Sequence, residues 1–195
     1  MISREKIPSR LPFSKEDIYL IVEGEVDEIF LDRIFSFFDK KYNVRIRVAG
    51  GNGNIPIHVN ILKKIYSFSK IFVLYDLDAN FTIKDIKKLL KNKEAIVKED
   101  EIFFVNPCIE HLVVLCKFFE NKKLKTKKDY QPLISKYYDL NYYGGHVPEM
   151  EKIVNKIFAE DYNRLMFNLS KTSTNDSDLP SSNFGYLVEK IKSKQ

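Results

Sequence analysis

The sequence has no apolar run long enough to span a membrane, and its first seventeen residues are a polar lead-in, unlike a secretory leader. We therefore expect a cytoplasmic protein with no membrane partner. Hydrophobic residues make up 44% of the chain and aromatic residues 13%, which excludes general disorder. The 195 residues are enough for one domain with a proper core and a small appendage.

Cysteine is scarce, with only Cys108 and Cys116 in the chain. They lie eight residues apart in a segment predicted to be helical, about 12 Å along the helix axis, which is too far for a disulfide. The absence of a CxxC motif and of zinc-type His/Cys spacing argues against a structural zinc site. We expect two reduced cysteines, at least one of them in the core.

The sequence also lacks nucleotide-binding signatures. It has no Walker A motif, and the glycine-rich loop Gly50–Asn54 does not follow the GxGxxG pattern. Any ATP-driven step must therefore come from another chain. The net charge of +5 is compatible with a nucleic-acid partner without establishing one.

Four apolar runs have the length of strands, and apolar residues at helical spacing follow each of them. The predicted strands are Ile18–Val22, Val44–Val48 (an alternating run near a sheet edge), Ile71–Tyr75 and Ile102–Val105. The predicted helices are Glu25–Asp39, one with Pro56 in its first turn and Ile57, Ile61, Leu62, Ile65 and Phe68 facing the core, Thr82–Lys91, and one through Ile109 to Phe119. This order predicts an α/β fold, an open parallel four-stranded sheet with helices on both faces.

The pattern changes after Phe119. The sequence predicts helices near Pro132–Tyr138, across Glu149–Phe167 and at Phe184–Lys192, with a polar loop at Lys171–Ser182. We therefore divide the chain into an α/β domain at 1–120 and a mostly helical extension at 121–195, packed on the same domain. Five lysines crowd the start of this extension and are either phosphate contacts or a solvated loop: Lys122, Lys123, Lys125, Lys127 and Lys128.

Acidic residues end two of the predicted strands. Glu23 follows the first strand, and Asp76 and Asp78 follow the third, on one side of an extended backbone. Ligands of open parallel sheets gather beyond the carboxyl ends of the strands. If these strands are neighbours, their carboxylates converge, and a hard cation such as Mg²⁺ relieves the repulsion. Each motif alone is also typical of an ordinary turn or helix cap.

The segments IVEGEVDEIFL and FVLYDLD together resemble the Toprim domain over Ile18 to Val105. That resemblance implies a four-stranded parallel sheet and Mg²⁺-dependent chemistry on nucleic-acid phosphodiesters. The element Asn106-Pro107-Cys108-Ile109-Glu110 is similar to a motif of RloB-type proteins, relatives of OLD-type nucleases. This second resemblance implies an effector of a bacterial anti-phage or restriction-linked system, encoded beside an ATPase.

From these observations we predict a metal-dependent phosphodiesterase, a DNA or RNA nuclease. Asp76 and Asp78 are the predicted ligands of Mg²⁺, or of Mn²⁺, and Glu23 either completes the set of ligands or moves a proton. Asp27 and Glu110 are further catalytic candidates, for a second ion or for its outer shell, although Glu110 also fits the acidic first turn of a helix. The alternative is a non-catalytic Toprim module that binds a partner ATPase or nucleic acid. The oligomeric state is open, a homo-oligomer included.

Overall fold

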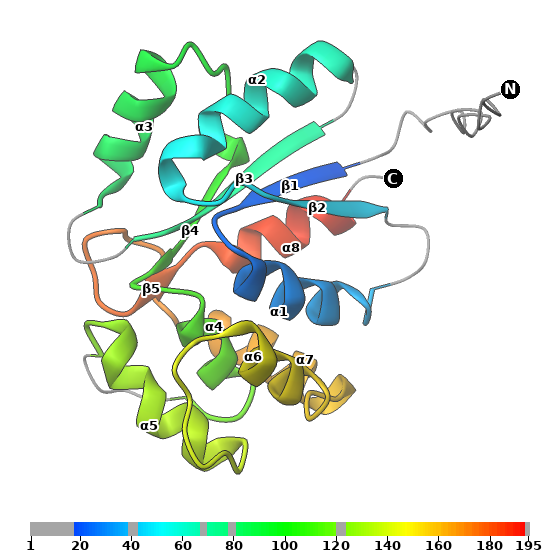
Figure 1. The fold of residues 1–195 in the computed structure, drawn as a ribbon, viewed down its shortest axis with the longest axis vertical. Coiled ribbons are helices and arrows are strands. Elements are labelled where there is room, and N and C mark those ends of the chain that lie inside the picture. Colours follow the sequence, from blue (N-terminus) through cyan, green and yellow to red (C-terminus); the bar gives the residue numbers. More distant parts are fainter. Residues whose placement is uncertain (1–17, 39–42, 67–69, 78–80, 120–123, 194–195) are drawn as a thin grey trace, which may run out of the picture.

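A mostly parallel sheet runs through the protein with the strand order β2-β1-β3-β4-β5 (Figure 1). The computed structural model describes residues 18–38, 43–66, 70–77, 81–119 and 124–193. The strands are β1 (Ile18–Val22), β2 (Val44–Val48), β3 (Lys70–Asp76), β4 (Ile102–Asn106) and β5 (Ser181–Ser182). The first four are parallel, and β5 pairs antiparallel with β4.

Helices cover both faces of this sheet. The elements of the α/β part are α1 (Glu25–Phe35), α2 (Ile55–Ile65), α3 (Ile83–Asn92) and α4 (Glu110–Leu115). Those of the C-terminal part are α5 (Lys127–Tyr137), α6 (Val147–Val154), α7 (Ala159–Leu169) and α8 (Phe184–Lys192). The predicted fold class is thus confirmed, with the short β5 as an addition. The predicted boundary between 120 and 121 lies outside the described residues.

The strand side chains alternate between two cores, as a sheet buried on both faces requires. Leu20 and Phe72 point into the larger core, which α1 and the helices of the C-terminal part close. Ile21 and Val73 point into the smaller core under α2 and α3. Both cysteines are buried and free, in agreement with the sequence prediction. No helix within the described ranges has the length and apolar character needed to cross a membrane.

Helix α2 packs through a different face from the one predicted. Its buried residues are Ile55, Pro56, Val59 and Leu62, whereas the predicted core residues Ile57, Ile61 and Ile65 are 46%, 45% and 61% exposed. The helix carries two apolar stripes, and periodicity alone does not decide which one packs against the sheet. Of the other two predicted contacts, Leu62 is buried as predicted, and Phe68 lies outside the described residues.

The helix predicted across Glu149–Phe167 is two helices, α6 and α7. The break occurs because Phe158 takes an extended backbone, and its N–H donates to Asp161 Oδ2 at 3.0 Å, starting a new helix. Just before it, the carbonyl of Ile157 accepts hydrogen bonds from the Arg33 guanidinium, at 3.0 Å from Nε. Helix α1 also ends earlier than predicted, at Phe35, and α4 is limited to six residues.

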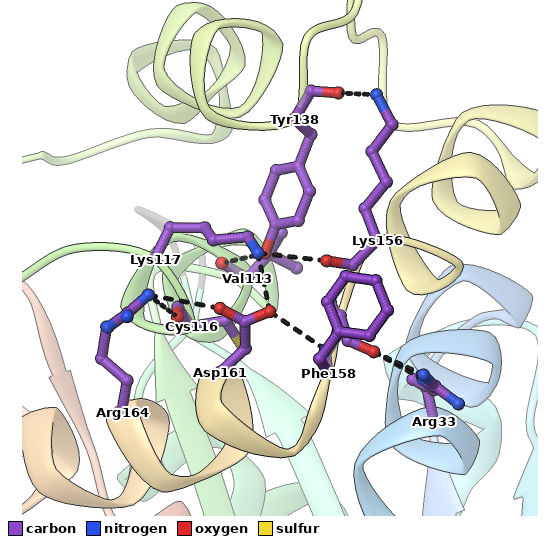
Figure 2. Close-up of polar contacts among 10 residues, drawn as sticks. Arg33, Val113, Cys116, Lys117, Tyr138, Lys156, Phe158, Asp161 and Arg164 are labelled. Atoms are coloured by element: carbon purple, nitrogen blue, oxygen red, sulfur yellow. Dashed lines mark hydrogen bonds and ion pairs between the residues drawn. The ribbon is translucent and has the colours of Figure 1, made fainter.

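A polar cluster ties the C-terminal helices to α4 (Figure 2). The carboxylate of Asp161 is 4% exposed and lies 2.6 Å from Lys117 Nζ and 3.2 Å from Arg164 Nη1. Lys117 Nζ also donates to the Lys156 carbonyl at 3.0 Å, and Tyr138 Oη donates to the Val113 carbonyl at 2.9 Å. The start of α7 is therefore held by charge as well as by apolar packing.

Asp161→Asn is expected to lower the free energy of unfolding by about 2 kcal/mol, because it breaks a largely buried ion pair. The change should appear as a lower urea midpoint with an unchanged slope. The matched control is Glu160→Gln, at the exposed neighbouring position. Equal stability of the two variants would contradict an anchoring role for Asp161.

Candidate metal and phosphodiester site

Strands β1 and β3 lie side by side, which brings two of the predicted acidic residues to one edge of the sheet. The strands are parallel, with Ile21 paired to Val73. Glu23 stands just beyond the end of β1, and Asp76 is the last residue of β3. The prediction that these two strands are neighbours in the sheet is therefore confirmed.

The turn after β1 is held from two sides. The Glu23 carbonyl accepts the N–H groups of Gly50 and Gly51 at 2.9 and 3.0 Å, so the glycine-rich loop fixes the backbone of this turn. Both glycines have positive φ, +71° and +121°, which explains the residue type there. The Gly24 N–H donates to Asp27 Oδ2 at 2.9 Å, which turns the carboxylate of Asp27 back toward Glu23.

Asp76 connects β3 to the turn that leads into α4. Its Oδ2 accepts the N–H of Ile109 at 3.1 Å. Within the same turn, the Asn106 side chain donates to the carbonyls of Asp176 and Asp178 at 2.9 and 3.0 Å. The Asn-Pro-Cys-Ile-Glu element therefore has a structural function, which is to join the sheet edge to the loop before β5.

Glu110 begins α4 and is fully buried. Its Oε1 accepts a hydrogen bond from Tyr143 Oη at 3.0 Å and lies 2.9 Å from Lys127 Nζ. Its other oxygen, Oε2, is buried with no hydrogen-bond partner. A buried carboxylate oxygen of this kind is rare and marks a place where a cation or water is expected.

A cleft of about 780 Å³ opens over the carboxylates of Glu23, Asp27 and Asp76, whereas the buried Glu110 does not line it. Its acidic wall contains Glu23, Asp27 and Asp76, and the opposite wall comes from the starts of α5 and α6. That opposite wall consists of Lys125, Thr126, Lys127, Gly145, His146 and Val147. The cleft therefore has one wall that carries acidic side chains and an opposite wall that carries two lysines.

The acidic groups raise one another's pKa. Burial, followed by the charges of Glu110 and Glu23, raises the pKa of Asp27 to about 7, against the lowering effect of the Gly24 N–H. Burial and then the charges of Asp27 and Glu110 raise the pKa of Asp76 well above its usual range. Asp27, Asp76, Glu110 and Glu23 thus share one electrostatic site, whose negative charge Lys127 offsets only in part.

The structure brings together some predicted site residues and leaves others apart. Glu23, Asp27, Asp76 and Glu110 form the acidic cluster, Lys125 and Lys127 line the cleft, and Lys128 is exposed on α5 outside it. Three predicted residues lie outside the described residues: Asp78, Lys122 and Lys123. Among the residues that the structure describes, no three His, Cys, Asp or Glu side chains are already grouped closely enough to hold a metal ion.

Sequence reasoning missed two contributors from the extension, Tyr143 and Gly145. Tyr143 is fully buried, and its hydroxyl donates a hydrogen bond to Glu110 Oε1. The only local signal was the Gly144-Gly145 pair, of which Gly145 has a φ of +84°.

Comparison with known proteins gives one structural likeness. No family model matches the chain, and no curated protein matches it. The C-terminal region of the Burkholderia pseudomallei OLD protein is similar over 82% of this chain and 99% of that one, with 12% identical residues and a TM-score of 0.45. The chemistry of the site therefore has to be argued from its own residues.

The raised pKa of Asp27 predicts a pH dependence of stability in the metal-free protein. The pKa of the Asp27 carboxyl is 3.8 in the unfolded chain and about 7 in the folded protein. The folded state therefore binds this proton more tightly between these two pH values. The stability from this group is thus present below pH 3.8 and is lost as the pH rises through about 7. In the wild type the free energy of unfolding should fall by up to about 1.4 kcal/mol per pH unit in this range because of Asp27, and Asp27→Asn should remove that dependence.

The measurement is urea unfolding of both proteins from pH 4.5 to 8 in EDTA. Glu25→Gln, an exposed acid in the same helical turn, serves as the control. Wild-type and Asp27→Asn profiles that run parallel over this range would contradict the shared acidic site.

Proposed function

We propose that this chain is a divalent-metal-dependent phosphodiesterase, a Toprim-type nuclease that acts on DNA or RNA. The observation that carries the proposal is the convergence of Glu23, Asp27, Asp76 and Glu110 at one edge of the sheet. Lys127 lies in the same cleft, within reach of a phosphate that enters it.

The donor atoms of this cluster suit a hard cation. All of them are carboxylate oxygens, which Mg²⁺ prefers and Mn²⁺ accepts. The partnerless Glu110 Oε2 and the raised pKa values of Asp27 and Asp76 are the marks of uncompensated negative charge, which a cation removes. We assign Glu23 and Asp76 as ligands, together with Asp78 from the sequence prediction. Asp27 and Glu110 serve a second ion or the outer shell.

The proposed mechanism divides the work between the two walls of the cleft. When bound, Mg²⁺ would activate water and stabilise the charge that develops on the phosphoryl oxygens. Glu23, at the turn after β1, accepts the proton of the attacking water. Lys127 contacts a phosphate oxygen as a point charge and orients the backbone of the substrate.

We extend the proposal to the biological setting that the RloB-type resemblance implies. There the chain is the nuclease effector of an anti-phage or restriction-linked system. The 195 residues contain no Walker A motif, so the ATPase activity that such a system uses lies outside them. Co-purification with the product of a neighbouring ATPase gene tests this partner.

A second candidate function is a non-catalytic Toprim module that regulates a partner ATPase or binds nucleic acid. It is favoured by the lack of any preformed group of three metal-ligating side chains in the described part of the chain. The two functions differ in metal binding. Calorimetric titration with Mn²⁺ should give saturable binding to the wild type and weaker binding to Asp76→Asn if the protein is a nuclease.

Asp76→Asn and Glu23→Gln are each expected to lower the rate of phosphodiester cleavage at least about 100-fold, because each removes a ligand or the base. Both substitutions keep the size of the side chain and remove its negative charge. Cleavage of single- and double-stranded DNA and RNA with Mg²⁺ or Mn²⁺ is the measurement, and Glu151→Gln, exposed on α6, is the control. Wild-type rates in both site variants would end the nuclease proposal.

The lysine wall predicts a change in the salt dependence of nucleic-acid binding. The Lys125→Ala/Lys127→Ala variant should reduce the slope of log K against log salt by about two, one unit per phosphate contact. Filter binding in Ca²⁺ measures the slope. Lys128→Ala, whose side chain is exposed outside the cleft, should leave it unchanged. Equal slopes for all three proteins would restore the solvated-loop interpretation of these lysines.

A further inference from the structure

The segment Tyr143–His146, which connects α5 to α6, lies directly on the Glu110–Lys127 pair. Tyr143 is fully buried, and its hydroxyl donates to Glu110 Oε1 at 3.0 Å. Lys127 Nζ approaches the same oxygen, at 2.9 Å. The orientation of both charged groups thus depends on where this segment runs.

Only a glycine at position 145 leaves room for the Lys127 side chain where it lies. A methyl group at this position would lie 2.5 Å from Lys127 Nζ and 3.3 Å from Glu110 Oε1, and the first of these distances is a steric clash. The φ of +84° also lies in the region that favours glycine. A side chain at position 145 would therefore force the end of the Lys127 side chain to move away from Glu110.

The segment is itself fixed by Glu149, in the first turn of α6. Its Oε2 accepts the N–H groups of Gly144, Gly145 and His146 at 2.6, 3.0 and 3.3 Å. Burial raises the pKa of this carboxyl, but the three N–H donors outweigh burial and lower it, so the group stays ionised. Three consecutive backbone donors on one carboxylate oxygen make a rigid support.

We propose that Tyr143, Gly145 and Glu149 are positioning residues that hold Lys127, through its ion pair with Glu110, in the orientation in which it contacts the phosphate of a bound nucleic acid. The inference rests on the proposed function and adds to it that the C-terminal extension completes the site. Side chains that contact the substrate must be held within a fraction of an ångström, which is the task of the groups behind them. None of the three residues contacts the substrate.

A double-mutant cycle between Gly145→Ala and Lys127→Ala tests the proposal. Gly145→Ala alone should displace the ammonium group and lower kcat about tenfold, the usual size for the loss of a supporting contact. It should also lower the salt slope of binding by about one, as Lys127→Ala does. In the Lys127→Ala background the added methyl meets no ammonium group, so neither quantity should fall further.

Two controls separate this effect from general damage. Gly185→Ala, in α8 and outside the cleft, adds a methyl that meets only Leu169 Cβ at 3.9 Å, and it should change neither kcat nor the salt slope. The strain from the positive φ of Gly145 is measured as the fall in Tm that Gly145→Ala causes in the Lys127→Ala background. Equal effects of Gly145→Ala on kcat and slope in both backgrounds would overturn the proposal.

Tyr143→Phe supplies an independent test, which holds even if Gly145→Ala does not fold. It removes only the hydroxyl on Glu110, so kcat should fall about tenfold while KM for the nucleic acid is unchanged. Tyr138→Phe, which removes a buried hydroxyl from the Val113 carbonyl, is the matched control and should lower only Tm. Matching kcat values for the two variants would assign Tyr143 a purely structural role and overturn the proposal.

The readouts also distinguish failure of the inference from failure of the nuclease proposal. A wild type that cleaves nothing with any metal, yet shows the Gly145–Lys127 coupling in binding, refutes the nuclease and supports the positioning role. A wild type that cleaves nucleic acid, together with additive effects of Gly145→Ala and Lys127→Ala, supports the nuclease proposal and refutes the positioning role.

Discussion

The pairing of β1 with β3 is the constraint on which the site depends, because it forces like charges together. Three of the four carboxylates have a donor near 3 Å: Gly24 N–H for Asp27, Ile109 N–H for Asp76, and Tyr143 with Lys127 for Glu110. These donors do not cancel the charge, since the pKa values of Asp27 and Asp76 remain raised. The fold thus holds negative charge at this edge that its own hydrogen bonds do not fully compensate.

The positive side of the cleft comes from a different part of the chain. Lys127 opens α5, and Gly145 precedes α6, so neither belongs to the sheet that carries the acids. Two contacts keep these parts in register: the hydrogen bond of Arg33 to the Ile157 carbonyl and the ion pair of Asp161 with Lys117. A shift of the extension by one ångström would therefore change the distance between the lysine and the carboxylates, so stability and site geometry are coupled.

The sheet and its acidic edge were predictable because both follow from strong local patterns. Continuous apolar runs identify β1 and β3, and the parallel order then fixes where Glu23 and Asp76 meet. The features that the sequence did not predict correctly are those that tertiary packing decides. Helix α2 has two apolar stripes, and only its packing selects the one with Val59. The contact of Gly145 with Lys127 joins residues eighteen positions apart across a turn, and no periodicity records such a contact.

Glu110 shows how a structural and a functional explanation can hold at once. The first turn of α4 tolerates an acid, which explains why a carboxylate is allowed at this position. It does not explain burial, because first-turn acids ordinarily face solvent, where they need no partner. The Glu110 carboxylate is fully buried, and its Oε2 has no hydrogen-bond partner. Its Oε1 contacts both Lys127 and Tyr143. The helix position therefore permits an acid at position 110 but does not account for its burial beside the acidic edge of the sheet.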